Sequence, residues 1–411
     1  MNLAEMKRKY AYTLARVGLN VQKGQPVLVE AAIEGADFTP IFAEECYKLG
    51  ASNVIVHYLD EPNMKIAAKY RSDADVRKVE DWEERQCQKY LDEGACYVRL
   101  EGVNPKLMED VPEAQANAIF AHTDAVRNIM RKASREKHCQ WLIAMIPTQS
   151  WAEFILKDVP KENALEELWK LLLKLCYIDE SNDVVETWEN KSKVNSERGM
   201  KIDSYKFRTL HYTASNGTDL TVGLMERSRF CAACDVTLSG VKYTPNMPTE
   251  EVFTTPKKGE AEGVVVASMP LSYQGQLIEN FSMEFKNGKV VSVKAEKNEA
   301  LLQRMVEMDE NAGYLGECAL VPKESPINQS GLIFYNTLFD ENASCHLALG
   351  MGYDTCVEGF ADLSREELEA MGVNDSVIHV DFMIGTDDMS IDGITEDGEI
   401  VPIFRNGTWA F

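Results

Sequence analysis

Residues 26–58 have the sequence PVLVEAAIEGADFTPIFAEECYKLGASNVIVHY, and this stretch decides the fold class of the first half of the chain. Its apolar pattern predicts a short strand at 26–30, a helix at 37–49 that is closed by Gly50, and a second strand at 52–58. Strand, helix and strand in this order make a βαβ unit, which favours a parallel sheet with a right-handed crossover. We therefore expect an N-terminal α/β domain.

The alternation of strands and helices continues until the middle of the chain. Further strands are predicted at 95–100 and 140–146, and further helices at 112–133, 151–156, 164–176 and 183–201. From Tyr205 onward the pattern changes to short strands and turns, and Asn287-Gly288 marks the clearest hairpin, at 281–293. We predict an α/β domain over 1–200 and a mixed, more β-rich α+β domain over 201–411.

Composition limits the possible partners and the compartment. The 411 residues include 66 acidic and 43 basic ones, and the resulting net charge of −23 disfavours nucleic acid and anionic membranes as partners. The same charge attracts cations, including metal ions and substrates with a free amine. No apolar run approaches the ~18 residues of a membrane span, and the N-terminal residues do not form a secretory signal. Ten scattered cysteines favour reduced thiols in a cytoplasmic protein.

Polar residues interrupt an apolar stretch near the C-terminus, NDSVIHVDFMIG at 374–385. The stretch predicts a buried strand over 377–384. His379 and Asp381 are two residues apart, so they emerge on the same face of that strand. Burying an imidazole and a carboxylate costs free energy unless they are paired or bound. Alone, they fit either a pair of metal ligands or a hydrogen-bonded pair in the core.

Three further polar clusters lie in the same half of the chain. They contain Glu250 and Glu251 (246–256), Glu317 (314–320), and Glu341 with His346 (340–350). Each has an ordinary interpretation as a solvated face, a carboxylate at a helix start or a satisfied core histidine. Together with His379 and Asp381, however, Glu251, Glu317, Glu341 and His346 supply four carboxylates and two imidazoles, which two divalent ions sharing a site would require. A mixed oxygen and imidazole shell suits Zn, Mn or Co better than Ca or Mg.

These clusters also carry a resemblance to a known family. The motifs NxPTEEVFT at 246–254, GE at 316–317, ENASxH at 341–346 and HxDFMIG at 379–385 resemble those of the M29, or thermophilic aminopeptidase, family of metallopeptidases. The similarity covers nearly the full chain. It implies two metal ions held by Glu251, Glu317, His346, His379 and Asp381, with Glu317 as the bridge. It further implies that Glu341 is another ligand or a neighbouring acid, that Tyr353 is catalytic, and that the protein is a homodimer.

The function expected from this resemblance is that of a dinuclear metallo-aminopeptidase. Such an enzyme releases N-terminal amino acids from peptides with a free N-terminus, by attack of a water activated between two divalent metal ions. The phenol of Tyr353 can donate a hydrogen bond to the oxyanion of the tetrahedral intermediate without adding a charge. Glu250 and Glu341 are both candidates to accept the proton of the water, and the sequence does not choose between them.

Two alternatives use the same residues differently. The first is a catalytically silent peptide-binding or assembly protein on the same fold, which the intact acids and histidines disfavour. The second is a thiol-dependent enzyme. Cys231 and Cys234 form a Cys-x-x-Cys pair, but no second pair follows at zinc-site spacing. Cys345 is adjacent to His346, yet neighbouring strand residues face opposite ways, so a Cys–His nucleophile is not expected.

Overall fold

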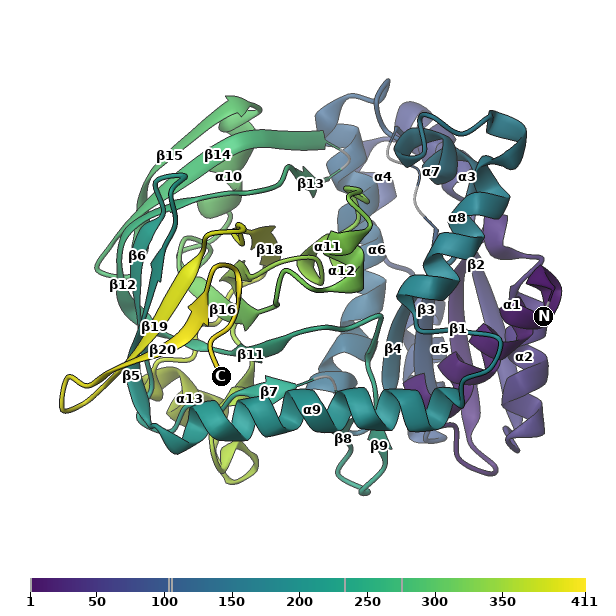
Figure 1. The fold of residues 1–411 in the computed structure, drawn as a ribbon. Coiled ribbons are helices and arrows are strands. Elements are labelled where there is room, and N and C mark those ends of the chain that lie inside the picture. The colour runs from purple at the N-terminus through teal and green to yellow at the C-terminus, as the bar shows by residue number, and fades with distance from the viewer. Residues whose placement is uncertain (1, 103, 105, 233, 275) are drawn as a thin grey trace. The chain divides into compact units, whose positions relative to one another are not determined.

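The computed structural model describes residues 2–102, 104, 106–232, 234–274 and 276–411 (Figure 1). The chain divides into two compact units. The first contains Met1–Asn190 and Cys234–Pro248, and the second contains Lys191–Ala233 and Thr249–Phe411. The first of the three points at which the chain passes from one unit to the other lies within helix α9 (Val184–Ser204). The first unit has an α/β fold and the second is rich in antiparallel strands, so the predicted fold class is confirmed.

The first unit is built on a parallel sheet with the strand order β10-β4-β3-β1-β2. Its strands are β1 (Pro26–Ala32), β2 (Asn53–Leu59), β3 (Cys96–Glu101), β4 (Trp141–Met145) and β10 (Asn246–Met247). Helix α2 (Thr39–Lys48) connects β1 to β2, as the opening sequence predicts. Gly50 follows this helix with φ = 101°, a left-handed conformation that glycine adopts without a steric penalty.

Helices cover both faces of the parallel sheet. They are α1 (Leu3–Thr13), α3 (Glu61–Tyr70), α4 (Asp73–Arg77), α5 (Asp81–Asp92), α6 (Glu113–Arg135), α7 (Gln149–Ile155) and α8 (Lys161–Leu175). On one face, Leu28 and Tyr97 pack with Met130 of α6 and Leu91 of α5. The opposite face carries Leu142, whose side chain is closely approached by Gly18 at the end of the π-helical turn Leu14–Gly18. A hairpin of β8 (Asp235–Val236) and β9 (Lys242–Tyr243) precedes β10.

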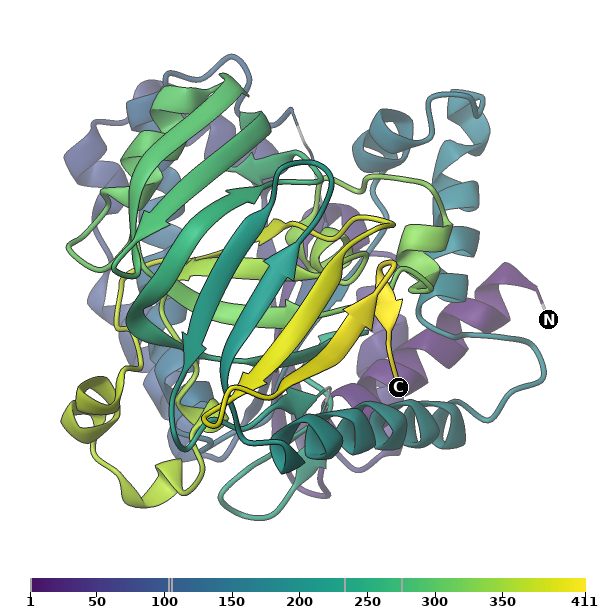
Figure 2. The ribbon, with the colours of Figure 1, turned by 60° about the vertical axis from the view of Figure 1, so that its left-hand side comes forward.

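The second unit contains two antiparallel sheets among the described residues. The larger has the order β13-β14-β12-β6-β5-β19-β20-β21, with β15 paired to β14. Its strands run side by side in Figure 2, from the green β14–β15 hairpin through teal to the yellow C-terminal strands. They are β5 (Phe207–Thr213), β6 (Asp219–Leu224), β12 (Pro256–Val266), β13 (Leu271–Tyr273), β14 (Gln276–Lys286), β15 (Lys289–Lys297), β19 (Ser390–Thr395), β20 (Ile400–Arg405) and β21 (Thr408–Trp409).

The smaller sheet has the order β18-β17-β16-β11-β7. Its strands are β7 (Cys231–Ala232), β11 (Val252–Thr254), β16 (Leu315–Leu320), β17 (His346–Gly350) and β18 (His379–Met383). Short helices flank the two sheets: α10 (Glu299–Val306), α11 (Pro326–Gln329), α12 (Thr337–Glu341) and α13 (Arg365–Met371). None of the described helices, in either unit, combines the length and the apolarity needed to cross a membrane.

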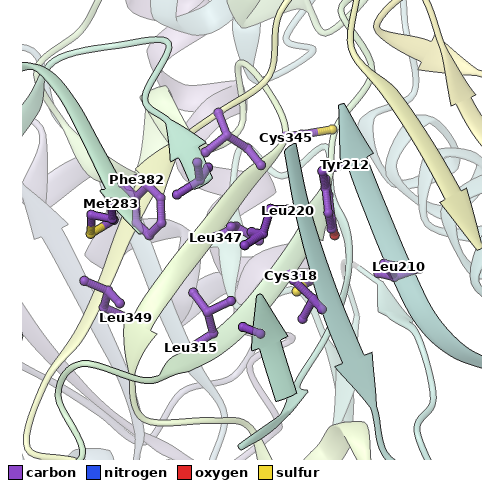
Figure 3. Close-up of a cluster of buried hydrophobic side chains, with 14 of the residues drawn as sticks. Leu210, Tyr212, Leu220, Met283, Leu315, Cys318, Cys345, Leu347, Leu349 and Phe382 are labelled. Carbon is purple, nitrogen blue, oxygen red and sulfur yellow. The ribbon is translucent and has the colours of Figure 1, made fainter. Parts of the chain in front are cut away.

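The core of the second unit lies between these sheets (Figure 3). Leu347, Leu349 and Phe382 contribute to it from the smaller sheet, and all three are fully buried. Leu210 and Leu220 face them from the larger sheet. Because side chains alternate along a strand, the residues between the core positions of the smaller sheet project from its other face. That face carries the polar residues of the sequence motifs.

One expected boundary near the polar motifs differs from the structure. The strand predicted over 377–384 is shorter, because β18 begins at His379 and Val377 is 79% exposed. Asp309 explains the difference, since its carboxylate accepts hydrogen bonds from the Val377 amide and the Ser376 hydroxyl and holds these residues in a turn. The 281–293 hairpin has left-handed Asn287 and Gly288 at its turn, as predicted.

Candidate metal centre

The strand register brings the polar residues of β16, β17 and β18 onto one face of the smaller sheet. Glu317 of β16 pairs with Ala348 of β17, and Ala348 pairs with Asp381 of β18. His346 begins β17, two residues before Ala348, and His379 is two residues before Asp381. All four side chains therefore leave the same face, opposite the core.

A β-bulge directs Glu317 toward this face. The register of β16 against β17 shifts between Leu315 and Glu317, which leaves Gly316 unpaired. Leu315 and Cys318 both point into the core, so the bulge inserts the residue that turns Glu317 away from it. A Cβ atom on Gly316 would lie 2.2 Å from the carbonyl oxygen of Met351, so only glycine fits at this position.

Glu251 reaches the same site from the segment before β11. Its backbone is held by two buried asparagines. The side-chain oxygen of Asn342 accepts a hydrogen bond from the Glu250 amide at 2.7 Å, and the Asn195 side chain donates to the Glu250 carbonyl at 3.3 Å. Asn342 follows Glu341 at the end of α12, and its side-chain nitrogen lies 3.4 Å from Glu341 Oε1. Asn342 thus connects two of the acidic segments.

The potential ligand atoms form two groups of three among the described residues. Glu251, Glu317 and His346 make the first, and Glu317, His379 and Asp381 make the second, with all atoms of a group within 4.8 Å of one another. His346 Nε2 lies 3.3 Å from Glu251 Oε2, and His379 Nε2 lies 3.1 Å from Glu317 Oε2 and 3.4 Å from Asp381 Oδ1. Glu317 is the residue that both groups share.

Backbone carbonyls orient both imidazoles. His346 Nδ1 donates to the Ser344 carbonyl at 3.2 Å, and His379 Nδ1 donates to the Met351 carbonyl at 2.7 Å. A carbonyl can only accept, so Nδ1 carries a proton in each ring, and Nε2 is left to face the carboxylates. This arrangement is the usual one for histidines that bind metal, whose second nitrogen is fixed by a neighbouring acceptor.

The site concentrates negative charge in a buried place. Glu251, Glu317, Glu341 and Asp381 are each at most 9% exposed, and within the described chain no lysine or arginine forms an ion pair with them. Burial raises the pKa of Glu317 to about 7, and the charges of Glu251 and Asp381 add to this effect against the hydrogen bond from His379. Uncompensated buried charge is costly, so the site needs cations.

The histidine pKa values indicate where those cations would bind. Burial lowers the pKa of His346, but its hydrogen bond and charge interaction with Glu251 outweigh burial and raise the pKa to about 10. His346 therefore holds a proton between Nε2 and the Glu251 carboxylate, at a position where a divalent ion would make the same contacts. Asp381 Oδ1, which is buried, has no hydrogen-bond partner among the described residues. A donor set of this kind fits a metal ion.

The three remaining predicted site residues, Tyr353, Glu341 and Glu250, lie outside both ligand groups and differ in their contacts. The Tyr353 hydroxyl lies 3.1 Å from His379 Nε2, and its ring packs edge-on against Phe253. Glu341 belongs to neither ligand group, although burial and the charges of Asp381 and Glu251 raise its pKa. Glu250 is also outside both groups, and its carboxylate accepts a hydrogen bond from Lys191 Nζ at 2.5 Å.

Sequence reasoning missed four residues that organise the site: Lys191, Asn195, Gly316 and Asn342. Asn342 lies inside the ENASxH motif, so its position next to Glu341 was a usable signal. Lys191 and Asn195 lie in a charged helix, where nothing in the sequence distinguishes them from exposed neighbours. Cys345 is confirmed to point away from His346 and into the core, where its thiol donates to the Val321 carbonyl (Figure 3).

A buried sheet face with two groups of carboxylates and imidazoles that share one glutamate defines a candidate metalloenzyme. Comparison with known proteins gives the family. The family model described as thermophilic metalloprotease (M29) matches residues 4–409. The chain belongs to this family, as its sequence motifs predict.

Known members of the family are similar to this chain over almost its full length. It is 40% identical over 402 residues to Aminopeptidase AmpS of Bacillus subtilis (strain 168), which covers 98% of each chain. It is 38% identical over 404 residues to Aminopeptidase 2 of Geobacillus stearothermophilus, covering 98% of this chain and 97% of the relative. The solved structure of wild-type AmpT from Thermus thermophilus superposes with a TM-score of 0.92, at 34% identity and full coverage of both chains.

Proposed function

We propose that this protein is a metallo-aminopeptidase, which removes N-terminal amino acids from peptides by using two divalent metal ions at the candidate centre. The observation that carries the proposal is the shared position of Glu317 in two groups of buried ligand atoms. The relatives that are named aminopeptidases support the reaction class. Their names do not state how many metal ions take part in the reaction. The proposed number of two ions therefore rests on the geometry of the site.

The ligand assignment follows the two groups. Glu251 and His346 would hold one ion, His379 and Asp381 the other, and Glu317 would contact both. Zn, Co or Mn suits these oxygen and imidazole donors. When bound, such ions supply Lewis acidity, which makes water a stronger acid near neutral pH and stabilises developing negative charge. Four carboxylates in or beside the groups match the charge of two divalent ions.

Tyr353 would act as a neutral hydrogen-bond donor to the substrate. Burial and the nearby carboxylates of Glu317 and Asp381 raise its pKa, so the phenol keeps its proton. A neutral hydroxyl can donate a hydrogen bond to the oxyanion of a tetrahedral intermediate. Contact of its ring with Phe253 fixes the direction in which the hydroxyl points. This arrangement supports the catalytic role expected from the sequence.

Glu341 is the better candidate to accept and relay the proton of the attacking water. Glu250 already accepts a hydrogen bond from a buried lysine, so it would have to give up this ion pair before it could accept a proton. Glu341 is buried close to the shared ligands and makes no ion pair with a described cation.

Peptides with a free N-terminus are the proposed substrates. Their ammonium group is attracted by the acidic site and by the strongly negative chain. A homodimer and a cytoplasmic location stay predictions of the sequence.

Metal reconstitution tests the proposal. Protein stripped with a chelator is supplied with Zn, Co or Mn, and metal content and hydrolysis of aminoacyl anilides are measured. We expect about two ions per chain and hydrolysis that requires them. An N-acetylated anilide of the same amino acid serves as the control and should not be cleaved. Peptide binding without metal uptake or hydrolysis would instead identify a silent binding protein.

A further inference from the structure

Two cysteines in the second unit lie side by side with no disulfide between them. The Sγ atoms of Cys231 and Cys356 are 3.8 Å apart. Cys231 lies in the edge strand β7 and is half-buried, whereas Cys356 is fully buried at the end of the 3-10 turn Asp354–Cys356. A disulfide has an S–S distance of about 2.05 Å, so the sulfurs would need to approach by about 1.8 Å. Movements of this size are within reach of side-chain rotation.

Both cysteines are linked to Tyr353, Cys356 to its backbone and Cys231 to its ring through Phe253. The Cys356 amide donates a hydrogen bond to the Tyr353 carbonyl at 3.1 Å. Cys231 pairs across the strands with Phe253, whose ring centroid is 5.5 Å from that of Tyr353. A bond that pulls the two sulfurs together therefore acts on the segment that carries Tyr353 and on the ring that supports it.

We propose that Cys231 and Cys356 form a reversible disulfide on exposure to a hydroperoxide, and that this bond displaces Tyr353 and lowers activity. The part concerning activity rests on the proposed function. In the first step the Cys231 thiol attacks the O–O bond, which gives a sulfenic acid and releases one water from hydrogen peroxide, or one alcohol from an organic hydroperoxide. In the second step the Cys356 thiol attacks the Cys231 sulfur, and the sulfenic oxygen leaves as water. The two thiols supply the two electrons that reduce the peroxide.

The exposure of the two residues sets the order of these steps. Cys231 is the more accessible thiol and can meet the peroxide first. Burial raises the pKa of Cys356, so this thiol is a poor first reactant but is already in place to resolve the sulfenic acid. The Cys-x-x-Cys spacing alone would have paired Cys231 with Cys234. Cys234 instead belongs to the first compact unit, where its sulfur lies 3.7 Å from the Thr244 hydroxyl.

Peptide mapping separates the two pairings. Trypsin cleaves after lysine and arginine, so Cys231 and Cys234 stay together in peptide 230–242, whereas Cys356 is in peptide 324–365. The metal-loaded enzyme is treated with hydrogen peroxide, alkylated and mapped without reductant. We expect peptides 230–242 and 324–365 to be joined in the wild type and in Cys234→Ser, but not in Cys231→Ser or Cys356→Ser. The Cys356→Ser variant is needed because peptide 324–365 also contains Cys345. A loop within peptide 230–242, or no cross-link, would overturn the proposal.

Activity gives the second readout on the same samples. We expect kcat to fall by about 100-fold or more on oxidation in the wild type and Cys234→Ser, and to recover with dithiothreitol, because loss of one oxyanion donor has effects of this size. Cys231→Ser should keep its kcat under the same treatment. A cross-link that leaves kcat unchanged would refute the coupling to Tyr353. Absence of hydrolysis before any treatment would refute the proposed function instead, while the cross-link would still report on the pairing.

Discussion

Glu317 of β16 and Asp381 of β18 lie in one cross-strand row, on either side of Ala348 of β17. The small side chain between them leaves room for two carboxylates to approach the same point. Both acids are fixed by the backbone ladder of the sheet, and Glu317 is additionally aimed by the bulge at Gly316. Sites built on strands hold their ligands more precisely than sites on loops. The shared ligand is therefore the place where a single change should have the largest effect.

Glu317→Gln should abolish most activity while leaving the fold largely intact. Glutamine keeps the shape of the side chain but removes the charge that both ligand groups need. We expect kcat to fall by at least about 100-fold and the metal content to decrease. Glu284→Gln is a matched control, since Glu284 is an exposed glutamate on β14. Near-normal rates for Glu317→Gln would contradict the bridging role.

Metal-free protein should become less stable as the pH rises. The folded-state pKa of Glu317 is raised from its ordinary value of 4.5 to about 7, and that of His346 from 6.5 to about 10. For both groups the folded state binds more protons than the unfolded state within these windows. Their contribution to the free energy of unfolding is thus fully present at low pH and is lost between about pH 4.5 and pH 10. Each unit of pKa difference between the folded and unfolded states is worth about 1.4 kcal/mol.

Denaturation in urea at pH 5, 7 and 9 measures this effect, with and without a chelator. Bound metal should reverse the trend, because metal ions replace the protons and bind more tightly as the ligands deprotonate. We expect the difference in unfolding free energy between loaded and stripped protein to grow with pH. A stripped protein that gains stability between pH 6 and pH 9 would show that the cluster does not carry these protons.

Tyr353→Phe should separate catalysis from metal binding. Phenylalanine retains the ring that packs against Phe253 but removes the hydroxyl near His379. We expect kcat to fall by about 100-fold, as for loss of one oxyanion donor, with little change in KM. Metal content should equal that of the wild type. Loss of metal in this variant would mean that the hydroxyl serves the ligands rather than the substrate.

The convergence of the histidines and acids could be predicted only in part from the sequence. His379 and Asp381 share a face because of simple strand alternation, which is a local property. Glu317 is different, since a regular strand would place it on the same face as Leu315, in the core. The bulge that reverses it depends on pairing with β17 and on the close approach of Met351 to Gly316. Contacts between residues far apart in the sequence cannot be predicted from the local pattern of apolar and polar residues.

Long-range pairing also explains what the sequence could not indicate about the fold. The parallel sheet follows from strands that alternate with helices, but its edge strand β10 comes from residues 246–247, far along the chain. A two-residue strand has no periodicity to recognise. Similarly, Glu250 and Glu251 are indistinguishable as adjacent acids in the sequence. The family resemblance already separates them by naming Glu251 as a ligand, but the pairing of Glu250 with Lys191 is visible only in the structure.

Asn342→Ala should weaken metal binding although Asn342 is not in either ligand group. This fully buried side chain accepts from the Glu250 amide and donates to the Leu338 carbonyl. Its loss leaves a buried amide unpaired, at a cost of about 1–3 kcal/mol. Because it also holds the segments of Glu251 and Glu341, we expect metal affinity to fall by about 10- to 100-fold.

Competition with a chelator measures that affinity, and urea denaturation measures the stability. Asn328→Ala is the matched control, because the Asn328 side chain also donates to a backbone carbonyl, that of Lys323. This control should lose some stability without a change in metal affinity. If Asn342→Ala behaves in the same way as the control, the asparagine stabilises the fold but does not position the ligands.

The ion pair between Lys191 and Glu250 makes the proposed choice of Glu341 as the proton acceptor testable. Their side chains are 13% and 8% exposed, and burial lowers the pKa of Lys191 against the opposing charge of Glu250. Removing one partner of such a buried pair costs about 3–5 kcal/mol, because the other charge is left behind. Glu250→Gln should therefore lower the free energy of unfolding by about this amount while kcat falls less than about 10-fold. Glu341→Gln should lower kcat by about 100-fold or more.

The double variant Lys191→Met with Glu250→Leu should recover stability, since it removes both charges. The opposite pattern, with Glu250→Gln fully stable but inactive and still loaded with metal, would make Glu250 the proton acceptor and leave Glu341 as a ligand.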